Sequence, residues 1–394
     1  MAKQNIVIVG GGFGGIRAAL LLTDSRHFKV TLITDHPDFR YYPSLYRTAT
    51  GGRRLASSID LEEIFDNKSI EIVQASLTTL DRQAKAIGLD NKQIIKYDSL
   101  ILALGVRTNY FHIDGLPEFS YGIKTDADAL KLKAHLHQQL IEDHKLDLNY
   151  IVIGGGPTGV ELAGVLPTYL KKVARSHGVK HPHVHIDLVE AAPRLVPRLP
   201  KDMSQAIARH LRRLGVKLYL GTTVKGETHD DLMLEDKKLA SHTVVWTAGV
   251  ANQPFFADNV FQMTKTGKVR VNQFLEAEPN IYVIGDNADT PYSGMAQTAL
   301  YDGAFVANNL MRKAENTDPK PYTAKRPIYV IPAGPKWSAV LWGKVRIYGR
   351  LGSMLRSLAD LVAYHDYEPW QLATKHWIAS EDSEESCPIC ASAS

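Results

Sequence analysis

A glycine-rich segment that occurs twice constrains the fold of this chain more than any other feature. Residues 5–15 read NIVIVGGGFGG and residues 149–159 read NYIVIGGGPTG, and each copy turns from a continuous apolar run into a helical pattern. Such runs are typical of buried parallel strands. The copies lie a domain's length apart, which is too far for a solenoid repeat. We therefore predict an α/β fold with two Rossmann-like dinucleotide-binding domains.

The first copy has the spacing G-x-G-x-x-G at Gly10, Gly12 and Gly15. The first glycine allows a tight turn, the second lets the backbone approach a pyrophosphate, and the third lets the helix pack closely on the strand. Amides at the helix N-terminus favour the anion. Asp35 ends the next predicted strand, at the distance expected of a residue that binds a ribose hydroxyl. Its neighbour Thr34 is the alternative ribose ligand.

The second copy repeats the device at Gly154, Gly156 and Gly159. Glu190 ends the following predicted strand and is the candidate ribose acid. A carboxylate there accepts hydrogen bonds from the 2′-hydroxyl and repels a 2′-phosphate, so we predict NADH rather than NADPH. Arg194, four residues later, leaves the alternative open, because an arginine can accommodate that phosphate.

Glu161 follows the second glycine segment, in the first turn of the predicted helix. Two interpretations fit it. An acidic side chain is favourable near the positive end of the helix dipole. Alternatively, the carboxylate handles protons beside the rings of two bound dinucleotides. Two dinucleotide sites in one chain indicate a flavin and a nicotinamide held face to face, with electrons passing between them.

The composition excludes several other classes of protein. The formal net charge is +4 over 394 residues and no dense basic stripe accompanies it, so we predict no nucleic-acid binding. The two cysteines, Cys387 and Cys390, form a single C-x-x-C pair near the C-terminus. One pair predicts no disulfide framework, and we predict no metal site. No segment offers about 18 uninterrupted apolar residues, so we predict no transmembrane helix.

Several ordered motifs resemble those of the type II, non-proton-pumping NADH:quinone oxidoreductases, within the pyridine nucleotide-disulfide reductase-like flavoproteins. They lie at residues 7–15, 43–51, 97–105, 246–249 and 284–286. The resemblance implies non-covalently bound FAD together with NADH. For FAD it implies contacts from Gly10, Gly12, Phe13, Gly14, Gly15, Thr34, Asp35, Tyr46, Leu77, Ala103, Leu104, Gly105, Gly285, Asp286, Ala296 and Gln297. For NADH it implies contacts from Gly154, Gly156, Pro157, Thr158, Gly159, Glu161, Glu190 and Gly249.

The branches of the superfamily differ in their electron acceptor, and two sequence features bear on which acceptor this chain uses. Disulfide reductases and sulfide:quinone reductases need cysteines beside the flavin, whereas this chain has none before Cys387. Residues 296–301, AQTALY, resemble the quinone motif A-Q-x-A-x-Q, with Gln297 at the first glutamine and Tyr301 in place of the second. The resemblance thus implies Glu161, Gln297 and Tyr301 as catalytic residues. A surface position for Gln297 is the alternative.

The chain becomes aromatic and basic from about Pro327. One predicted helix has an apolar face made of Leu351, Met354, Leu355, Leu358, Leu361 and Val362. We expect the face to be bordered by Arg346, Arg350 and Arg356, with Trp342, Trp370, Lys375 and Trp377 nearby. Such a helix suits the headgroup plane of a bilayer, and the resemblance implies the same anchor. Docking on the protein's own core or on a second subunit, as in a homodimer, are the alternatives.

These interpretations combine into one functional prediction. We predict an FAD-binding domain in two parts (1–112 and 256–326), an NAD-binding domain (113–255), a membrane-associating module (327–380) and a disordered tail (381–394). NADH would reduce FAD, which would pass two electrons to a membrane quinone, menaquinone or ubiquinone. The protein would be peripheral on the cytoplasmic face of the cell membrane. The rivals are an NADH-dependent reductase of a soluble carrier, of rubredoxin or ferredoxin type, and a flavoprotein redox sensor.

Overall fold

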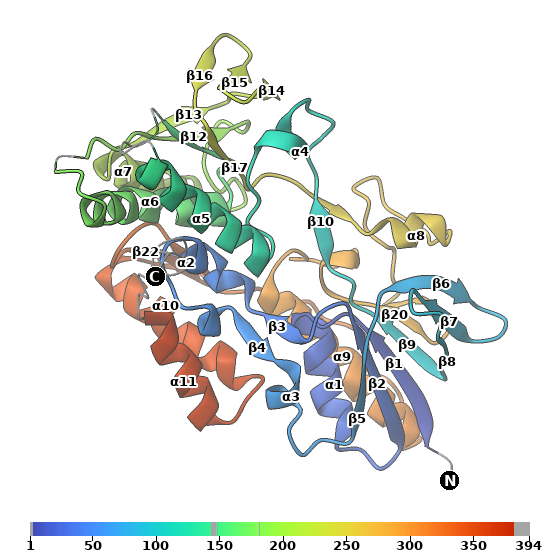
Figure 1. Ribbon diagram of the computed structural model, residues 1–394. Helices are drawn as coiled ribbons and strands as arrows, with labels where there is room; N and C mark the ends of the chain where they lie inside the picture. Colours follow the sequence, from blue (N-terminus) through green and yellow to red (C-terminus); the bar gives the residue numbers. More distant parts are fainter. Residues whose placement is uncertain (1–2, 143–146, 148, 181, 382–394) are drawn as a thin grey trace.

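Two parallel sheets with helices on their faces make up most of the molecule. The computed structural model describes residues 3–142, 147, 149–180 and 182–381. Figure 1 shows the unit of the first glycine segment in blue, the unit of the second in green, and the C-terminal segment in red beside both. The predicted α/β fold with two Rossmann-like units is confirmed.

The first unit is built on a six-stranded sheet whose central strands are the predicted apolar runs. β1 (Gln4–Val9) lies between β2 (Phe28–Thr34) and β9 (Ser99–Leu102) and is parallel to both. β20 (Ile281–Val283) pairs in parallel with β9, so the chain returns to this sheet after completing the second unit. The edge strands are β5 (Ile70–Gln74) and β19 (Glu276–Glu278).

Helices α1 (Phe13–Thr23) and α9 (Ala296–Ala314) pack against each other beside this sheet. Their backbones touch, because a Cβ added at Gly303 would lie 2.2 Å from the carbonyl oxygen of Gly14. The other face of the sheet shares a core with a small antiparallel sheet. That sheet consists of β6 (Leu77–Asp81), β7 (Ala86–Leu89) and β8 (Ile94–Lys96).

The second unit repeats the pattern on a four-stranded parallel sheet in the order β13-β12-β11-β17. Its strands are β11 (Tyr150–Ile153), β12 (Ile186–Glu190), β13 (Val216–Leu220) and β17 (Thr243–Trp246). Its helices are α5 (Asp126–Glu142), α6 (Pro157–Ser176) and α7 (Lys201–Arg213). An antiparallel hairpin sheet, β14 (Val224–Glu227), β15 (Asp231–Leu234) and β16 (Lys238–Ala240), extends from it.

Shorter elements connect these units. β10 (Val106–Thr108) and β18 (Val250–Asn252) pair antiparallel where the chain passes between the two sheets. The others are β3 (Asp38–Arg40), η1 (Tyr42–Ser44), α2 (Leu45–Ala49), η2 (Arg54–Ala56), β4 (Ser58–Asp60), α3 (Leu61–Ile64), α4 (Leu116–Phe119), α8 (Pro254–Asp258) and η3 (Gly285–Asn287).

The C-terminal segment contains a three-stranded antiparallel sheet as well as the expected helix. The sheet was not predicted. Its strands β21 (Tyr329–Pro332), β22 (Ser338–Trp342) and β23 (Val345–Gly349) precede α10 (Arg350–His365) and α11 (Trp370–Glu381). Ile331 and Leu341 belong to the core of the second unit, whereas Tyr364 and Ala373 belong to a core of the first. The segment therefore packs on both units. Of the predicted disordered tail, only Glu381 is described, as the last residue of α11, and both cysteines lie outside the described residues.

Helix α10 is oriented with its apolar side outward. Leu351, Met354, Leu358 and Val362 are each between 53% and 63% exposed. The buried side is polar and includes Arg356. The prediction that Arg356 borders the apolar face was therefore wrong: this guanidinium turns inward to a buried carboxylate. Within the described part of the chain, no helix is both long enough and apolar enough to cross a membrane.

Candidate functional site

The glycine turn of the first unit has the geometry that a bound pyrophosphate needs. Gly10 has a φ of +115°, which is a left-handed conformation that L side chains rarely adopt. A Cβ added at Gly15 would lie 2.0 Å from the carbonyl oxygen of Gly10, so helix and strand touch there. Around Gly12, by contrast, a Cβ would meet no atom within 4 Å. Gly12 is also the N-cap of α1 and offers no side-chain cap, so the first amides of the helix are available to an anion.

The second unit repeats this geometry closely. Gly154 has a φ of +110°, and a Cβ at Gly159 would lie 1.8 Å from the carbonyl oxygen of Gly154. Gly156 caps α6 without a side-chain hydrogen bond and faces open space. Pro157 and Thr158 form the first turn of α6. Both turns thus fit the pyrophosphate of a dinucleotide, which is the chemistry predicted for them.

The two units differ at the residue that ends the second strand. Gly10 donates to Ile33 and Gly154 donates to Val189, so the residue after each acceptor, Thr34 and Glu190, occupies the same position in its unit. Thr34 is buried against the glycine turn. Asp35 lies one position further on, with a 65% exposed side chain paired to His36. Of the two predicted ribose ligands, Thr34 is therefore the residue equivalent to Glu190.

Glu190 is held firmly against the second glycine turn. Its Oε2 accepts a hydrogen bond from the Gly155 amide and its Oε1 accepts one from the Ala192 amide at 2.7 Å. Arg194, which the sequence left as a possible phosphate partner, donates instead to the carbonyl of Leu199 at 2.6 Å and to Ser204 Oγ at 2.8 Å. With that guanidinium engaged inside its own loop, the local chemistry favours a free 2′-hydroxyl over a 2′-phosphate.

Two buried polar residues join the loops that were predicted to face the flavin. Asn287 accepts a hydrogen bond from the Gly105 amide at 3.0 Å and donates to the Gly105 carbonyl at 2.7 Å. Asp302 accepts from the Gly285 amide at 3.1 Å and from Tyr322 Oη at 2.6 Å. Burial raises the pKa of Asp302 to about 6. The sequence interpretation overlooked both residues, because neither lies in a motif that it used.

The remaining predicted cofactor contacts lie in these same regions. Ala103 and Leu104 follow β9 and lead into Gly105, and Asp286 accepts a hydrogen bond from the Gly294 amide at 3.1 Å. Leu77 begins β6, where it is half-buried. Phe13 starts α1 within a cluster of aromatic rings, and Tyr46 is buried on α2. Gly249 links β17 to β18 with a φ of +72°, and Ala296 is the first residue of α9.

A buried cluster of charges surrounds Glu161, at the junction of α6, α2 and α10. Asp360 of α10 is paired with Arg356 at 3.1 Å and with Arg47 of α2 at 4.0 Å. Asp360 also accepts a hydrogen bond from Tyr41 Oη at 2.7 Å. The C-terminal helix, on its inward face, therefore forms part of the wall around Glu161. The sequence interpretation put Glu161 in the first turn of its helix, whereas it is the fifth residue of α6. It also did not connect Glu161 to Asp360, which lies about 200 positions later.

This cluster sets the protonation of its members. Burial raises the pKa of Glu161 to about 7, against the opposing attraction of Arg356. Burial alone would lower the pKa of Arg356, but the nearby carboxylate of Asp360 outweighs it, so the pKa of Arg356 is raised and it stays charged. Burial alone would also lower the pKa of Arg47, but its interactions with Tyr46 and Asp360 outweigh burial and raise that pKa. Glu161 is thus a buried carboxyl that exchanges its proton near neutral pH.

Gln297 and Tyr301 lie on the first turns of α9, and both contact the segment that leads to β21. The Gln297 amide donates to the Ile328 carbonyl at 3.0 Å and accepts from the Ile328 amide at 3.0 Å. The Tyr301 ring lies 5.6 Å from that of Tyr322, and the Lys325 ammonium lies 4.4 Å from its centre. Gln297 is exposed, as the alternative interpretation expected, and it ties α9 to the C-terminal segment.

Comparison with known proteins gives the family of this chain. The family described as pyridine nucleotide-disulphide oxidoreductase matches residues 4–303. The chain belongs to this family. A type II NADH:quinone oxidoreductase of Staphylococcus saprophyticus is 27% identical over 333 residues, which span 78% of this chain and 82% of that protein. The resemblance to the type II enzymes that the motifs indicated is confirmed by such relatives.

Solved structures agree on the fold. The structure of NDH2 from Plasmodium falciparum in complex with NADH has a TM-score of 0.84 at 17% identity and covers 98% of this chain and 99% of its own. A sulfide:quinone oxidoreductase from Aquifex aeolicus has a TM-score of 0.79 at 20% identity, covering 95% and 92%. Because both enzymes share the fold, residue chemistry has to distinguish them. The absence of cysteine before Cys387 argues against the sulfide chemistry.

Proposed function

We propose that this protein is a non-proton-pumping NADH:quinone oxidoreductase that holds FAD in its first unit and NADH in its second. The buried carboxyl of Glu161 carries the proposal. It is the fifth residue of α6, the helix that follows the second glycine turn, and its pKa is raised to about 7 by burial. The relatives named type II NADH:quinone oxidoreductase support the choice of reaction.

Each part of the site has a separate task in this reaction. Bound FAD would supply the redox chemistry, accepting a hydride from NADH and passing two electrons to a quinone. Gly12 and Gly156 leave room for the two pyrophosphates, and Thr34 and Glu190 lie where the ribose hydroxyls would be bound. Glu161 would release its proton toward the quinone oxygen, since its pKa matches neutral pH. Gln297 and Tyr301 would orient the quinone at the start of α9.

NADH consumption by the purified FAD-loaded protein tests the proposal. We expect fast turnover with analogues of menaquinone or ubiquinone, and faster turnover when the quinone is supplied in liposomes. Rapid reduction of the flavin without quinone turnover would contradict the proposal. It would point instead to a soluble electron carrier or to a redox sensor.

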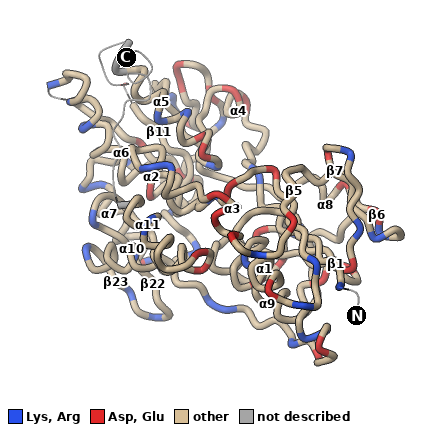
Figure 2. The backbone as a smooth tube through the Cα atoms, turned by 60° about the horizontal axis from the view of Figure 1, so that its bottom comes forward, with Lys and Arg blue, Asp and Glu red and all other residues tan. Residues whose placement is uncertain are grey.

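The outward face of α10 supports a bilayer as the partner surface. Its four exposed apolar side chains are accompanied by Trp342 and Trp370, which are 59% and 53% exposed. Residues 319–359 contain lysines and arginines but no aspartate or glutamate. Figure 2 shows such basic positions on the chain beside α10. Apolar side chains with basic and tryptophan neighbours suit the headgroup region of an anionic membrane. We place the protein on the cytoplasmic face, where NADH is available.

Charging the apolar face of α10 should abolish membrane binding. In a variant with Met354→Glu and Leu358→Glu, we expect affinity for anionic liposomes to fall at least about 100-fold, since burial of each of the two side chains contributes about 1.5–3 kcal/mol. Co-sedimentation with liposomes measures this. Leu130→Glu, at an exposed leucine of α5, is the matched control and should bind as the wild type does. Equal binding of the two variants would show that α10 is not the docking face.

Glu190 should decide which nicotinamide cofactor is used. Glu190→Gln removes the negative charge that repels a 2′-phosphate, so we expect the ratio of kcat/KM for NADPH to that for NADH to rise at least about tenfold. Steady-state kinetics with both cofactors provide the measurement. Glu235→Gln, at an exposed glutamate of the same unit, should leave the ratio unchanged. An unchanged ratio in Glu190→Gln would place the ribose elsewhere.

A further inference from the structure

A second buried group of polar side chains lies away from the dinucleotide sites, where the C-terminal helices meet the first unit. Glu63 lies on α3, Glu368 lies between α10 and α11, and His376 lies on α11. The side chains of Glu368 and His376 are completely buried, and that of Glu63 is 26% exposed. One oxygen of each carboxylate and the imidazole Nε2 lie within 4.8 Å of one another.

The imidazole of His376 is fixed with its Nε2 toward both carboxylates. Its Nδ1 donates a hydrogen bond to the Leu55 carbonyl at 2.8 Å, which leaves the lone pair of Nε2 facing Glu368 Oε1 and Glu63 Oε2. A backbone carbonyl on the other ring nitrogen is one of the usual supports of a metal-binding histidine. A lone pair that faces two carboxylates requires a positive charge between them, which is either a proton or a metal ion.

The distance between Glu368 and His376, together with their unpartnered atoms, favours the metal ion. Nε2 lies 3.4 Å from Glu368 Oε1 and 3.8 Å from Glu63 Oε2. A proton shared between an imidazole and a carboxylate brings the two atoms to about 2.7–2.9 Å. Ligands at about 2.0–2.2 Å from a tetrahedral ion are separated by roughly 3.3–3.6 Å. Both oxygens of Glu368 and the Nε2 of His376 have no hydrogen-bond partner, although all three atoms are buried.

We propose that Glu63, Glu368 and His376 bind a divalent transition-metal ion of the zinc type, with a water as the fourth ligand. Two carboxylates and a neutral imidazole balance the charge of such an ion and are among its usual ligands. The partly exposed Glu63 provides the route of entry. Lys375 lies 3.7 Å from the other oxygen of Glu63 and would orient this carboxylate. The ion would join α3 to the α10–α11 connection and to α11.

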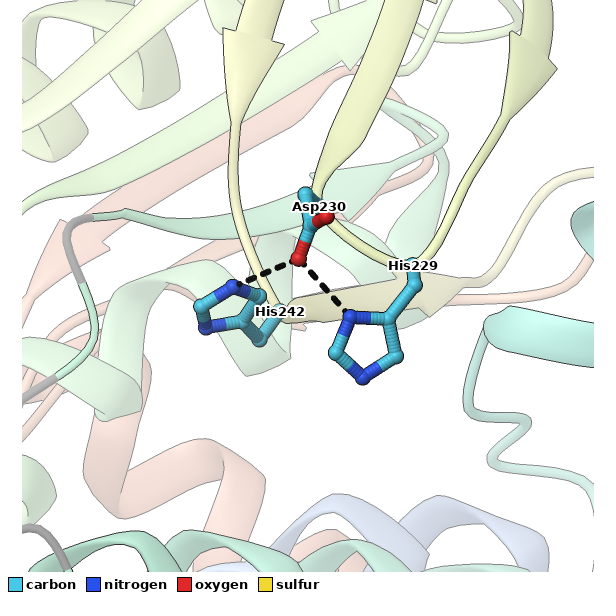
Figure 3. A group of neighbouring side chains, drawn as sticks. All are labelled: His229, Asp230 and His242. Carbon is cyan, nitrogen blue, oxygen red and sulfur yellow. Dashed lines mark hydrogen bonds and ion pairs between the residues drawn. The ribbon is translucent and has the colours of Figure 1, made fainter.

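An exposed triad offers a useful contrast. Figure 3 shows His229 and His242 turned toward the same oxygen of Asp230, at 2.8 and 3.2 Å. Here the nitrogens already have a hydrogen-bond acceptor, and the side chains are between 47% and 79% exposed. Its atoms are satisfied without a metal, so we assign no site to it. Exposed histidines and the cysteines Cys387 and Cys390 can nevertheless bind added zinc weakly. These side chains are therefore substituted in the zinc-binding experiment.

The test is zinc binding by the full-length, FAD-loaded protein carrying His229→Ala, His242→Ala, Cys387→Ser and Cys390→Ser. Equilibrium dialysis with elemental analysis should find one zinc ion per chain, and zinc should raise the Tm. Adding Glu63→Gln should weaken zinc binding at least about tenfold and remove the rise in Tm. Glu62→Gln, at the exposed neighbour on α3, is the matched control and should retain both.

Two results would overturn the proposal. One is that the four-substitution background binds no zinc, in which case the group is an ion pair between carboxylate and imidazolium. The other is that Glu63→Gln and Glu62→Gln bind zinc equally well. Anomalous diffraction at the zinc edge from crystals of the wild-type protein gives an independent measurement. A peak within about 2.2 Å of His376 Nε2 supports the site, and its absence from zinc-soaked crystals contradicts it.

Discussion

Glu161→Gln is expected to lower kcat with quinone about 100-fold while leaving the reduction of FAD by NADH nearly unchanged. A glutamine cannot supply a proton, and loss of a positioned proton donor costs about 10²–10⁴-fold in rate. Stopped-flow flavin absorbance measures the first half-reaction, and steady-state NADH consumption measures the whole cycle. Glu118→Gln, at an exposed glutamate of α4, is the matched control for both measurements. Equal slowing of both half-reactions would assign Glu161 a structural role.

The pH dependence of Glu161→Gln separates proton transfer from structure. The wild-type protein should lose quinone turnover as the pH rises above about 7, where Glu161 deprotonates, and the variant should not show this inflection. Stability follows from the same shift. Because burial raises the folded pKa from 4.5 to about 7, the folded state binds more protons over this range and the free energy of unfolding falls as pH rises through it. Chemical denaturation of the variant should show a weaker fall.

Gly15→Ala should yield a protein without FAD and with a markedly lower Tm. Its Cβ would lie 2.0 Å from the carbonyl oxygen of Gly10, a backbone atom that cannot rotate away. We expect a cost of at least about 3 kcal/mol, the upper end of the range for overpacked positions. Flavin absorbance after purification and thermal denaturation are the measurements.

Gly12→Ala is the informative comparison, because the same methyl group is added three residues away. No atom lies within 4 Å of its Cβ, so we expect a cost in folding stability below about 1 kcal/mol, from the less favourable N-cap. FAD affinity should nevertheless fall at least about tenfold, because the methyl group occupies the space by which the pyrophosphate approaches. If Gly12→Ala bound FAD as tightly as the wild type, the first turn would not be the flavin site.

The parts of the fold that could be predicted were those that depend on the order of residues within a short segment of the chain. The two glycine turns, their strands and their helices follow from residues that are neighbours in the chain, so Gly10 to Gly15 and Gly154 to Gly159 were located directly. The apolar stripe of α10 was visible for the same reason. The pattern favoured a stripe that faces a bilayer but left docking on the protein's own core or on a second subunit open. The orientation depends on the opposite side of α10, where Asp360 pairs with Tyr41 and Arg47 from the other end of the chain.

Contacts between distant positions explain the rest. Asn287 and Asp302 act on Gly105 and Gly285, but no local spacing marks either residue as part of the site. Asp35 matched the expected distance from Gly15, yet hydrogen-bond register puts Thr34 in the equivalent position. Counting residues from Gly15 cannot show whether the segment before the second strand is one residue longer or shorter, so the count cannot distinguish Thr34 from Asp35. The sheet of β21 to β23 was missed because its short runs of apolar residues have little periodicity.

The pairing of β20 with β9 has a consequence for the biogenesis of the protein. During synthesis, β9 emerges from the ribosome long before β20, and the whole second unit is translated between them. At ordinary rates of about 5–20 residues per second, β9 stays an uncovered sheet edge for roughly 10–35 s. Uncovered edges recruit other chains, so the nascent protein passes through an aggregation-prone stage until β20 covers β9. Fragments that end before β20 should accumulate as insoluble material, even though they contain the complete first glycine turn.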